Sequence, residues 1–171
     1  MTRYVALLRG VSPRNAKMPA LRRCFEEAGF GNVRTLLSSG NVAFDARGAA
    51  GSALERRAEA AMQQHLGCSF YTIVRTTAQL QALLASDPFA GHVLPRGAKR
   101  VVSFLRAPAR PLLALPLAAD GASVLGCIGR EVFTAYVPGD KGPVFMKLIE
   151  SAFGTEVTTR TWNTVARCAA A

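Results

Sequence analysis

The sequence has few of the features that form metal sites, disulfide frameworks or membrane spans. Its four cysteines lie far apart without a C-x-x-C pair, and it has only two histidines. This spacing argues against a zinc site and against a secreted disulfide framework. It predicts a cytoplasmic protein with reduced cysteines, no metal and no cofactor. No apolar run approaches the roughly 20 residues of a membrane span, so we expect no membrane association.

Acidic residues are also scarce, because 11 Asp and Glu stand against 21 Lys and Arg, for a formal net charge of +10. A basic protein favours an anionic partner, either a nucleic acid or a phosphorylated small molecule. The excess is spread evenly, with 11 basic and 6 acidic side chains in residues 1–90 and 10 and 5 in residues 91–171. Since 17 of the 21 basic residues are arginine, a bias in coding composition is the alternative explanation.

The hydrophobic pattern repeats one order of elements twice: strand, helix, strand, strand, helix, strand. The first copy has expected strands at residues 3–9, 33–37, 42–45 and 70–75 and helices at 18–28 and 52–66. The second has expected strands at 100–105, 124–128, 132–137 and 156–160 and helices at 112–119 and 144–152. Pro111 and Pro116 weaken the expected helix at 112–119.

This order predicts an α+β fold of two tandem ferredoxin-like (βαββαβ) subdomains. The subdomains are expected at residues 1–75 and 99–160, with a linker helix and loop at 76–98 and a C-terminal helix at 161–171. The first and fourth strands are apolar on both faces, which is typical of a sheet covered on both faces. We therefore expect little open sheet for the base stacking that RNA-recognition domains use.

Capping residues mark three of the expected helix starts. Ser52 and Glu55 have the spacing of a capping box, and so do Thr76 and Gln79. Thr161 suits the N-cap of the C-terminal helix, because its hydroxyl can accept a backbone N–H of the first turn.

Two candidate site segments lie in the first half. The loop at residues 9–17 contains Arg9 and Lys17 and leads into a helix N-terminus, where N–H groups and the helix dipole attract anions. A solvated polar loop is the alternative. The predicted hairpin tip holds Ser39, Gly40 and Asn41, residues that turn chemistry alone also favours.

Two further candidates lie in the second half. Residues 158–164 are dense in hydrogen-bonding groups and contain Arg160, Trp162 and Asn163. A core anchor at the tryptophan and a cap at Thr161 are the alternative explanation. Residues 139–142 precede an expected helix and form a second candidate anion cradle, with a flexible loop as the alternative.

Five segments carry a family resemblance: residues 4–10, 17–21, 33–42, 87–89 and 158–165. Together they resemble the bacterial family called domain of unknown function 1697. The resemblance implies a small cytosolic bacterial α+β protein with two ferredoxin-like subdomains, and it implies no reaction. The chain departs from the family pattern at residues 11–15, Val-Ser-Pro-Arg-Asn, where the family's usual Ile-Asn-Val-Gly-Gly supplies two glycines to the loop.

The leading hypothesis is a non-enzymatic binding module for an anionic ligand, either a phosphorylated small molecule or a nucleic acid. It would use the ends of strands and helices near Arg9, Lys17, Asn41 and Arg160.

Two alternatives stay open. One is an enzyme with a polar cluster of Ser39, Asn41, Arg160 and Asn163 in a cleft between the halves. The other is a homodimeric structural or regulatory module, suggested by the strands that are apolar on both faces.

Overall fold

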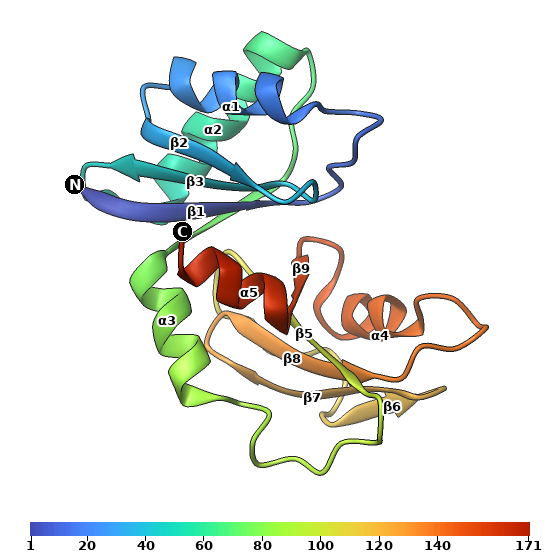
Figure 1. Ribbon diagram of the computed structural model, residues 1–171. Coiled ribbons are helices and arrows are strands. Elements are labelled where there is room, and N and C mark those ends of the chain that lie inside the picture. The colour runs from blue at the N-terminus through green and yellow to red at the C-terminus, as the bar shows by residue number, and fades with distance from the viewer. The chain divides into compact units, whose positions relative to one another are not determined.

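The computed structural model describes residues 1–171, which form two compact units. The first unit consists of Met1–Ala82 together with Ala166–Ala171, and the second of Leu83–Val165. The fold is a mixed α+β fold with two antiparallel sheets and five helices (Figure 1). No helix combines the length and the hydrophobicity needed to cross a membrane.

The first unit is built on a four-stranded sheet with the strand order β2-β3-β1-β4. Its elements are β1 (Thr2–Leu8), α1 (Met18–Glu27), β2 (Gly31–Leu36), β3 (Asn41–Ala46), α2 (Gly51–Leu66) and β4 (Thr72–Thr76). The helix α3 (Thr77–Ser86) begins in this unit, and α5 (Trp162–Ala169) ends in it. In Figure 1, α1 and α2 lie on the same face of this sheet.

The core of the first unit lies between that face and the two helices. Tyr4, Ala6 and Leu8 of β1 belong to this core, with apolar stripes from α1 and α2. The rings of Phe30 and Phe44 pack against each other within it at a tilt, with centroids 4.3 Å apart and an interplanar angle of 34°. The opposite face of β1 is buried as well, which confirms the expectation from its doubly apolar pattern.

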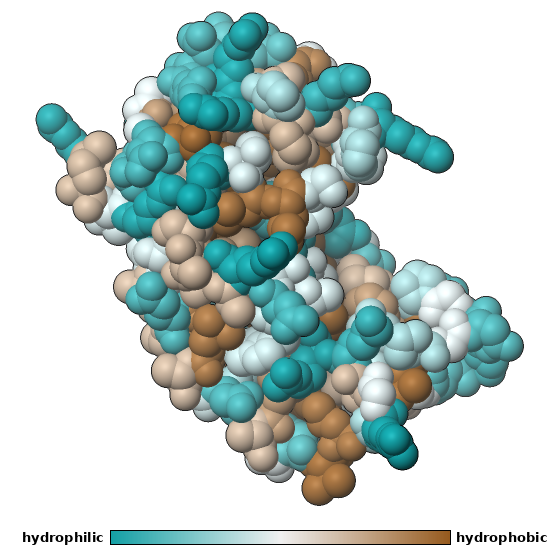
Figure 2. Space-filling model, in the orientation of Figure 1, coloured by the Kyte–Doolittle hydropathy of each residue, from teal (hydrophilic) through white to brown (hydrophobic).

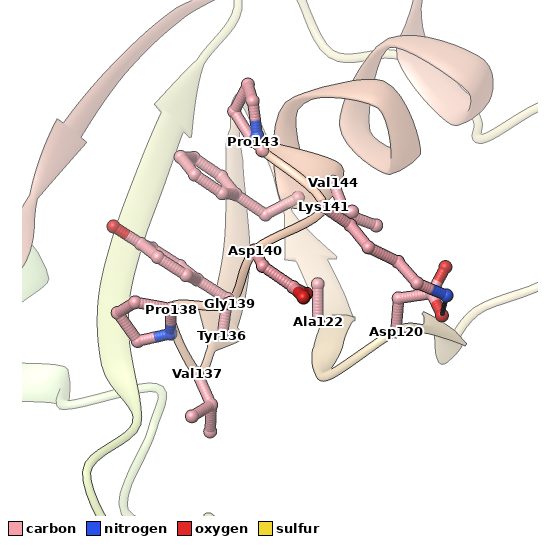
Figure 3. A pocket seen from close by; sticks show the side chains of 12 residues that line it. Asp120, Ala122, Tyr136, Val137, Pro138, Gly139, Asp140, Lys141, Pro143 and Val144 are labelled. Atoms are coloured by element: carbon pink, nitrogen blue, oxygen red, sulfur yellow. Dashed lines mark hydrogen bonds and ion pairs between the residues drawn. The ribbon is translucent and has the colours of Figure 1, made fainter.

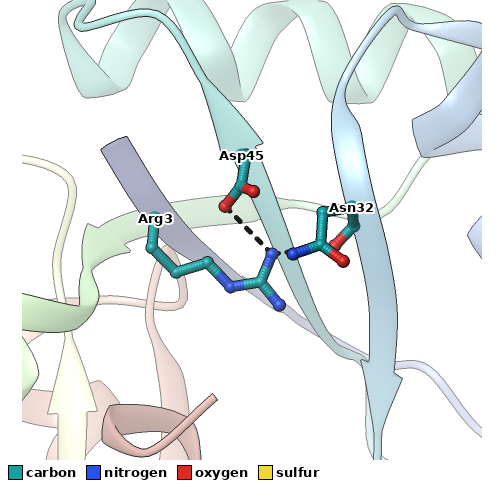
Figure 4. Close-up of polar contacts among 3 residues, drawn as sticks. All are labelled: Arg3, Asn32 and Asp45. Carbon is teal, nitrogen blue, oxygen red and sulfur yellow. Dashed lines mark hydrogen bonds and ion pairs between the residues drawn. The ribbon is translucent and has the colours of Figure 1, made fainter. Parts of the chain in front are cut away.

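An arginine ties three strands of this sheet together at an irregular position. Nη1 of Arg3 donates to the carbonyl oxygen of Asn32 at 2.7 Å and lies 3.1 Å from Oδ1 of Asp45 (Figure 4). Asn32 has a φ of 45° and lies where β2 shifts register against β3, between Gly31 and Arg34. The ion pair therefore stabilises a bulge, which bends and twists the edge strand locally.

The second unit contains a five-stranded sheet with the order β6-β7-β8-β5-β9. Its elements are β5 (Lys99–Phe104), β6 (Leu117–Ala119), β7 (Ala122–Ile128), β8 (Glu131–Tyr136), α4 (Val144–Phe153) and β9 (Thr158–Thr161). The core beneath α4 is smaller than that of the first unit and is centred on Val124, Val132 and Ile149.

The predicted helix at residues 112–119 is wrong. Residues 107–114 are exposed and outside any helix or strand, and residues 117–119 form the edge strand β6, which pairs with β7. Pro111 and Pro116 have no N–H to donate, so a helix here would lose backbone hydrogen bonds. The Leu112 N–H instead donates to the carbonyl oxygen of Ala152 at 2.8 Å, and Leu115 packs on the core.

Two of the three predicted caps are confirmed. The Thr76 N–H donates to Oε1 of Gln79 at 2.9 Å, and the Gln79 N–H donates to Oγ1 of Thr76 at 3.0 Å. At the start of α5, the Thr164 N–H donates to Oγ1 of Thr161 at 3.3 Å.

The predicted capping box of Ser52 and Glu55 is wrong. Helix α2 begins at Gly51 without a side-chain cap. Glu55 is buried, and its Oε1 accepts the N–H of Val74 on β4 at 3.0 Å. The carboxylate faces the sheet because a buried strand N–H without an acceptor costs more than an open helix end exposed to water.

The loop that follows α3 within the predicted linker at 76–98 has a buried part and an exposed part. Phe89 is buried in the second unit, whereas Val93 is fully exposed. Figure 2 shows hydrophobic residues at the surface along the loop between α3 and β5. The first residues of this segment therefore belong to the packed second unit.

Candidate functional site

The hairpin tip in the first unit uses its polar side chains to hold its own turn. Asn41 is fully buried, and its Nδ2 donates to the carbonyl oxygen of Leu36 at 3.1 Å and to Oγ of Ser39 at 3.0 Å. Gly40 has a φ of 82°, and a Cβ there would lie 2.9 Å from Cβ of Val11. The tip thus packs closely against the loop after β1, as turn chemistry and close backbone approach require.

The loop that contains Arg9 and Lys17 is also closed by internal hydrogen bonds. Oδ1 of Asn15 accepts the N–H of Ser12 at 2.8 Å, and Nδ2 of Asn15 donates to the carbonyl oxygen of Gly10 at 2.8 Å. Arg9 is half-buried, and Lys17 is exposed at the start of α1 without capping it. The structure therefore brings this loop and the hairpin tip together, through their packing.

Arg160 in the second unit holds the end of an edge strand. Its side chain is on β9, and the residue is only 8% exposed. Nη1 of Arg160 donates to Oγ1 of Thr158 at 2.8 Å and to the carbonyl oxygen of Thr159 at 2.9 Å. Both of these hydrogen bonds are to residues of β9 itself, so they stabilise the conformation of this strand.

Trp162 and Asn163 line a cavity of about 250 Å³, which we call the Arg100 pocket. Its lining consists of Ala98, Lys99, Arg100, Thr161, Trp162 and Asn163. The two segments meet because β5 pairs with β9, with Val101 opposite Thr161. The lining includes two cationic residues, Lys99 and Arg100, and no acidic one, beside the first turn of α5.

Aromatic rings hold the arginine of this pocket. The Arg100 guanidinium carbon lies 5.8 Å from the centroid of the Phe89 ring and 6.0 Å from that of Trp162. Phe89 meets Trp162 edge to face, with centroids 5.2 Å apart, and Phe133 likewise at 5.9 Å. Such rings attract a cation through their negative faces and limit its rotamers. Two segments that carry the family resemblance, 87–89 and 158–165, therefore meet at this pocket.

Sequence reasoning missed Lys99, Arg100 and Phe89 as site residues. Arg100 begins the predicted strand at 100–105 and Lys99 directly precedes it, whereas Phe89 lies in the predicted linker at 76–98. The available signal was the adjacent Lys-Arg pair before an apolar strand. Only the pairing of β5 with β9 places that pair beside Trp162.

A larger cavity, of about 410 Å³, lies beside the loop that joins β8 to α4 (Figure 3). Tyr136 and Phe145 stack in its wall with centroids 4.0 Å apart. Nζ of Lys141 lies 2.9 Å from Oδ1 of Asp120, so the one lysine of the predicted anion cradle at 139–142 is already paired. The lining of this cavity therefore contains carboxylates beside its lysine, whereas the lining of the Arg100 pocket contains none.

Thiol chemistry has little support in the structure. None of the four cysteines forms a disulfide. Burial raises the pKa of the Cys24 thiol, and burial together with the nearby Glu131 raises the pKa of Cys127. Both groups are therefore protonated at neutral pH, which opposes a nucleophilic role.

The polar cluster required by the enzyme hypothesis is divided between the units. Ser39 and Asn41 belong to the first unit, and Arg160 and Asn163 to the second. Within each unit, Ser39, Asn41 and Arg160 take part in local hydrogen bonds.

The family comparison confirms the resemblance found in the sequence. The sequence model of the protein family of unknown function DUF1697 matches residues 1–133, and the chain belongs to this family. The solved structure of the conserved bacterial protein SP0830 from Streptococcus pneumoniae is similar, with a TM-score of 0.69 and 17% sequence identity. The match covers 99% of this chain and 97% of that chain, and it supports the shared fold. No curated protein matches the chain significantly.

Proposed function

We propose that this protein is a binding module for a small anionic molecule, whose phosphoryl or carboxyl group enters the Arg100 pocket. The observation that carries the proposal is that the lining of this cavity includes Lys99 and Arg100, neighbours on β5, and no acidic residue. A guanidinium presents a planar fork of donors that matches phosphate and carboxylate oxygens. The first turn of α5 adds N–H groups and the positive end of a helix dipole.

The size of the pocket favours a small ligand. Its volume of about 250 Å³ is below the range of roughly 300–1,000 Å³ that is typical of drug-sized ligands. A phosphoryl group with a small body would fill it. A nucleic acid would lie across the opening and place a single phosphate inside, and it is therefore the alternative ligand.

The side chains around the pocket have different roles in binding the anion. Arg100 is oriented by Phe89 and Trp162, so it loses little rotamer freedom when an anion binds. Thr161 is engaged with Thr164, since their hydroxyl oxygens lie 2.9 Å apart. Asn163 is exposed and offers an amide donor at the rim.

Fluorescence of Trp162, the single tryptophan, provides the test. Inorganic phosphate, pyrophosphate, a sugar phosphate and a single-stranded oligonucleotide are titrated at several salt concentrations. We expect saturable binding of a phosphate compound, weakened about tenfold by R100Q and by K99Q, because each removes a charge-assisted hydrogen bond. The matched control is K147Q, which changes an exposed lysine of α4 outside the lining.

Equal affinity in all three variants, or no saturable response to any phosphate compound, would refute the proposal. Binding of the oligonucleotide alone, with a steep loss as salt rises, would indicate the nucleic-acid alternative.

For the architecture we propose a duplicated ferredoxin-like plan, in which the second copy has lost its first helix. The order β2-β3-β1-β4 and the order β7-β8-β5-β9 within the second sheet support it. The subdomain boundaries, a cytoplasmic location and a homodimer stay predictions.

A further inference from the structure

The first unit has a basic cavity of its own, of about 350 Å³. Its lining includes Gly29, Arg47, Gly48, Ala49, Leu54 and Arg57, and we call it the Arg57 cavity. The lining contains two arginines and no acidic residue. None of these residues belongs to the Arg100 pocket or to the candidate segments found in the sequence.

The guanidinium of Arg57 is held in place before any ligand arrives. Its Nε donates to the carbonyl oxygen of Ala28, and its guanidinium carbon lies 4.7 Å from the centroid of the Phe30 ring. A Cβ at Gly29 would lie 2.5 Å from Nη2 of Arg57, so the glycine leaves room for this side chain. An arginine fixed in this way retains its terminal N–H groups for an anion and loses little entropy on binding.

Arg47 reaches the same cavity from a different element. It lies in the loop between β3 and α2, directly before Gly48 and Ala49. The Ala49 N–H is taken by the hydroxyl of Tyr4 at 3.3 Å, which fixes the loop to β1. Two arginines from separate elements therefore line one cavity, and their mutual repulsion is relieved by a bound anion.

The cavity beside the loop between β8 and α4 in the second unit differs from the Arg57 cavity in having carboxylates in its lining. There the loop between β8 and α4 lines the cavity of about 410 Å³, where Lys141 is paired with Asp120. In the first unit the loop between β3 and α2 occupies the equivalent position, and no carboxylate lines the cavity. The cavity beside this loop thus has two carboxylates and one lysine in its lining in the second unit, whereas the charged side chains that line the cavity in the first unit are both arginines.

We propose that the Arg57 cavity is a second anion site, which binds a phosphate or pyrophosphate group between Arg47 and Arg57. Leu54 on its wall offers apolar contact to the body of a phosphate ester. This site is independent of the Arg100 pocket, and either can exist without the other.

Amide chemical shifts test the proposal on the full chain labelled with ¹⁵N. Pyrophosphate is titrated into the wild type and into R100Q, which removes the arginine of the other pocket. We expect saturable shifts at the amides of Gly29, Gly48 and Ala49 in both proteins. Shifts confined to residues 98–100 and 161–163, or no saturable shift at the three amides, would overturn the proposal.

Two variants in the cavity lining and one control variant at the adjacent Arg56 complete the test. R47Q and R57Q should each weaken the pyrophosphate response at Gly48 about tenfold, as expected for loss of one charge-assisted contact. R47Q changes an exposed loop residue, so it is informative even where R57Q loses its packing on Phe30. R56Q alters the adjacent exposed arginine outside the lining and should leave the response unchanged. Equal responses in R47Q and R56Q would overturn the site.

Discussion

The two units share a strand order but differ in how helices cover their sheets. Val5 of β1 pairs with Ala43 and Arg75, and in the second unit Val102 of β5 pairs with Phe133 and Arg160. In both units the last strand ends at a threonine that caps the next helix. The first unit has a helix between its first two strands, whereas the second has an exposed segment and the short strand β6.

The single helix on the second sheet also lies over different strands from α2. In the first unit α1 packs on β2 and α2 packs on β4. In the second, α4 packs mainly on β7, with β6 and β8 beside it. Since β7 has the place of β2 in the strand order, the one remaining helix covers the side that α1 covers in the first unit.

The residues on the helix-facing side of each sheet differ accordingly. Three register-equivalent pairs are Ala6 and Ser103, Val74 and Thr159, and Phe44 and Thr134. The hydroxyls of Ser103 and Thr159 lie 2.7 Å apart, whereas Oγ1 of Thr134 is buried without a hydrogen-bond partner. At these three positions the face covered by two helices carries apolar side chains, and the face covered by one helix carries hydroxyl groups.

The largest expected difference in stability is between a substitution in α1 and one in the exposed segment at residues 107–114, which stands between the first two strands of the second unit. Leu21 of α1 is fully buried, and Leu112 of the segment is 78% exposed. We expect L21A to lower the free energy of unfolding by about 2–5 kcal/mol, through lost burial and a cavity, and L112A by less than about 0.5 kcal/mol. Urea unfolding followed by circular dichroism measures both. A cost above 1.5 kcal/mol for L112A would mean that the segment is packed as α1 is.

A smaller effect is expected where α2 meets the edge strand β4. Glu55 accepts the N–H of Val74 at 3.0 Å, and half-buried Glu59 accepts that of Thr72 at 2.9 Å. E55A should cost about 1.5–3 kcal/mol, because a buried donor loses a charged acceptor, and E59A should cost less. Amide hydrogen exchange should accelerate at Val74 in E55A and at Thr72 in E59A.

The control for these variants is E26A, which removes an exposed ion pair with Arg22 in α1. It should change the free energy of unfolding by less than about 0.5 kcal/mol. Unchanged exchange at Val74 in E55A would show that α2 does not protect this edge.

The smallest effect concerns the hydroxyls in the second unit. T134V replaces an unpaired buried hydroxyl by a methyl group of similar shape, so we expect stability to stay equal or to rise by about 1 kcal/mol. S103A removes a hydroxyl that is bonded to Thr159, so it should lower stability by about 1 kcal/mol. Thermal unfolding of both variants measures the difference. A destabilised T134V would mean that its hydroxyl is satisfied in solution.

Most strands were predictable because alternation and turn residues act over a few neighbouring positions. The cap at Thr76 was predictable for the same reason, since its partner Gln79 is three residues away. The box at Ser52 failed because Glu55 has a competing partner, Val74, on another element. No helix forms at 112–119 because Pro111 and Pro116 lack backbone donors, a cost that the apolar spacing of this segment does not offset.

The candidate site was only partly predictable. Trp162 and Asn163 line the Arg100 pocket as the dense polar segment suggested, whereas Ser39, Asn41 and Arg160 stabilise turns and strands. Polar residues in tight turns satisfy backbone groups as readily as they bind ligands, so composition alone does not separate the two roles.

By itself, the sequence determined the order of most elements, the doubly buried first strand and the family, because these depend on local periodicity and on contiguous motifs. Only the tertiary structure decided that Arg100 lies against Phe89 and Trp162, and that Arg57 and Arg47 line one cavity. Phe89, Arg100 and Trp162 come from separate segments of the second unit, and Arg47 and Arg57 come from a loop and a helix of the first. The pairing of strands and the packing of helices bring the members of each set together, and local sequence patterns do not record that proximity.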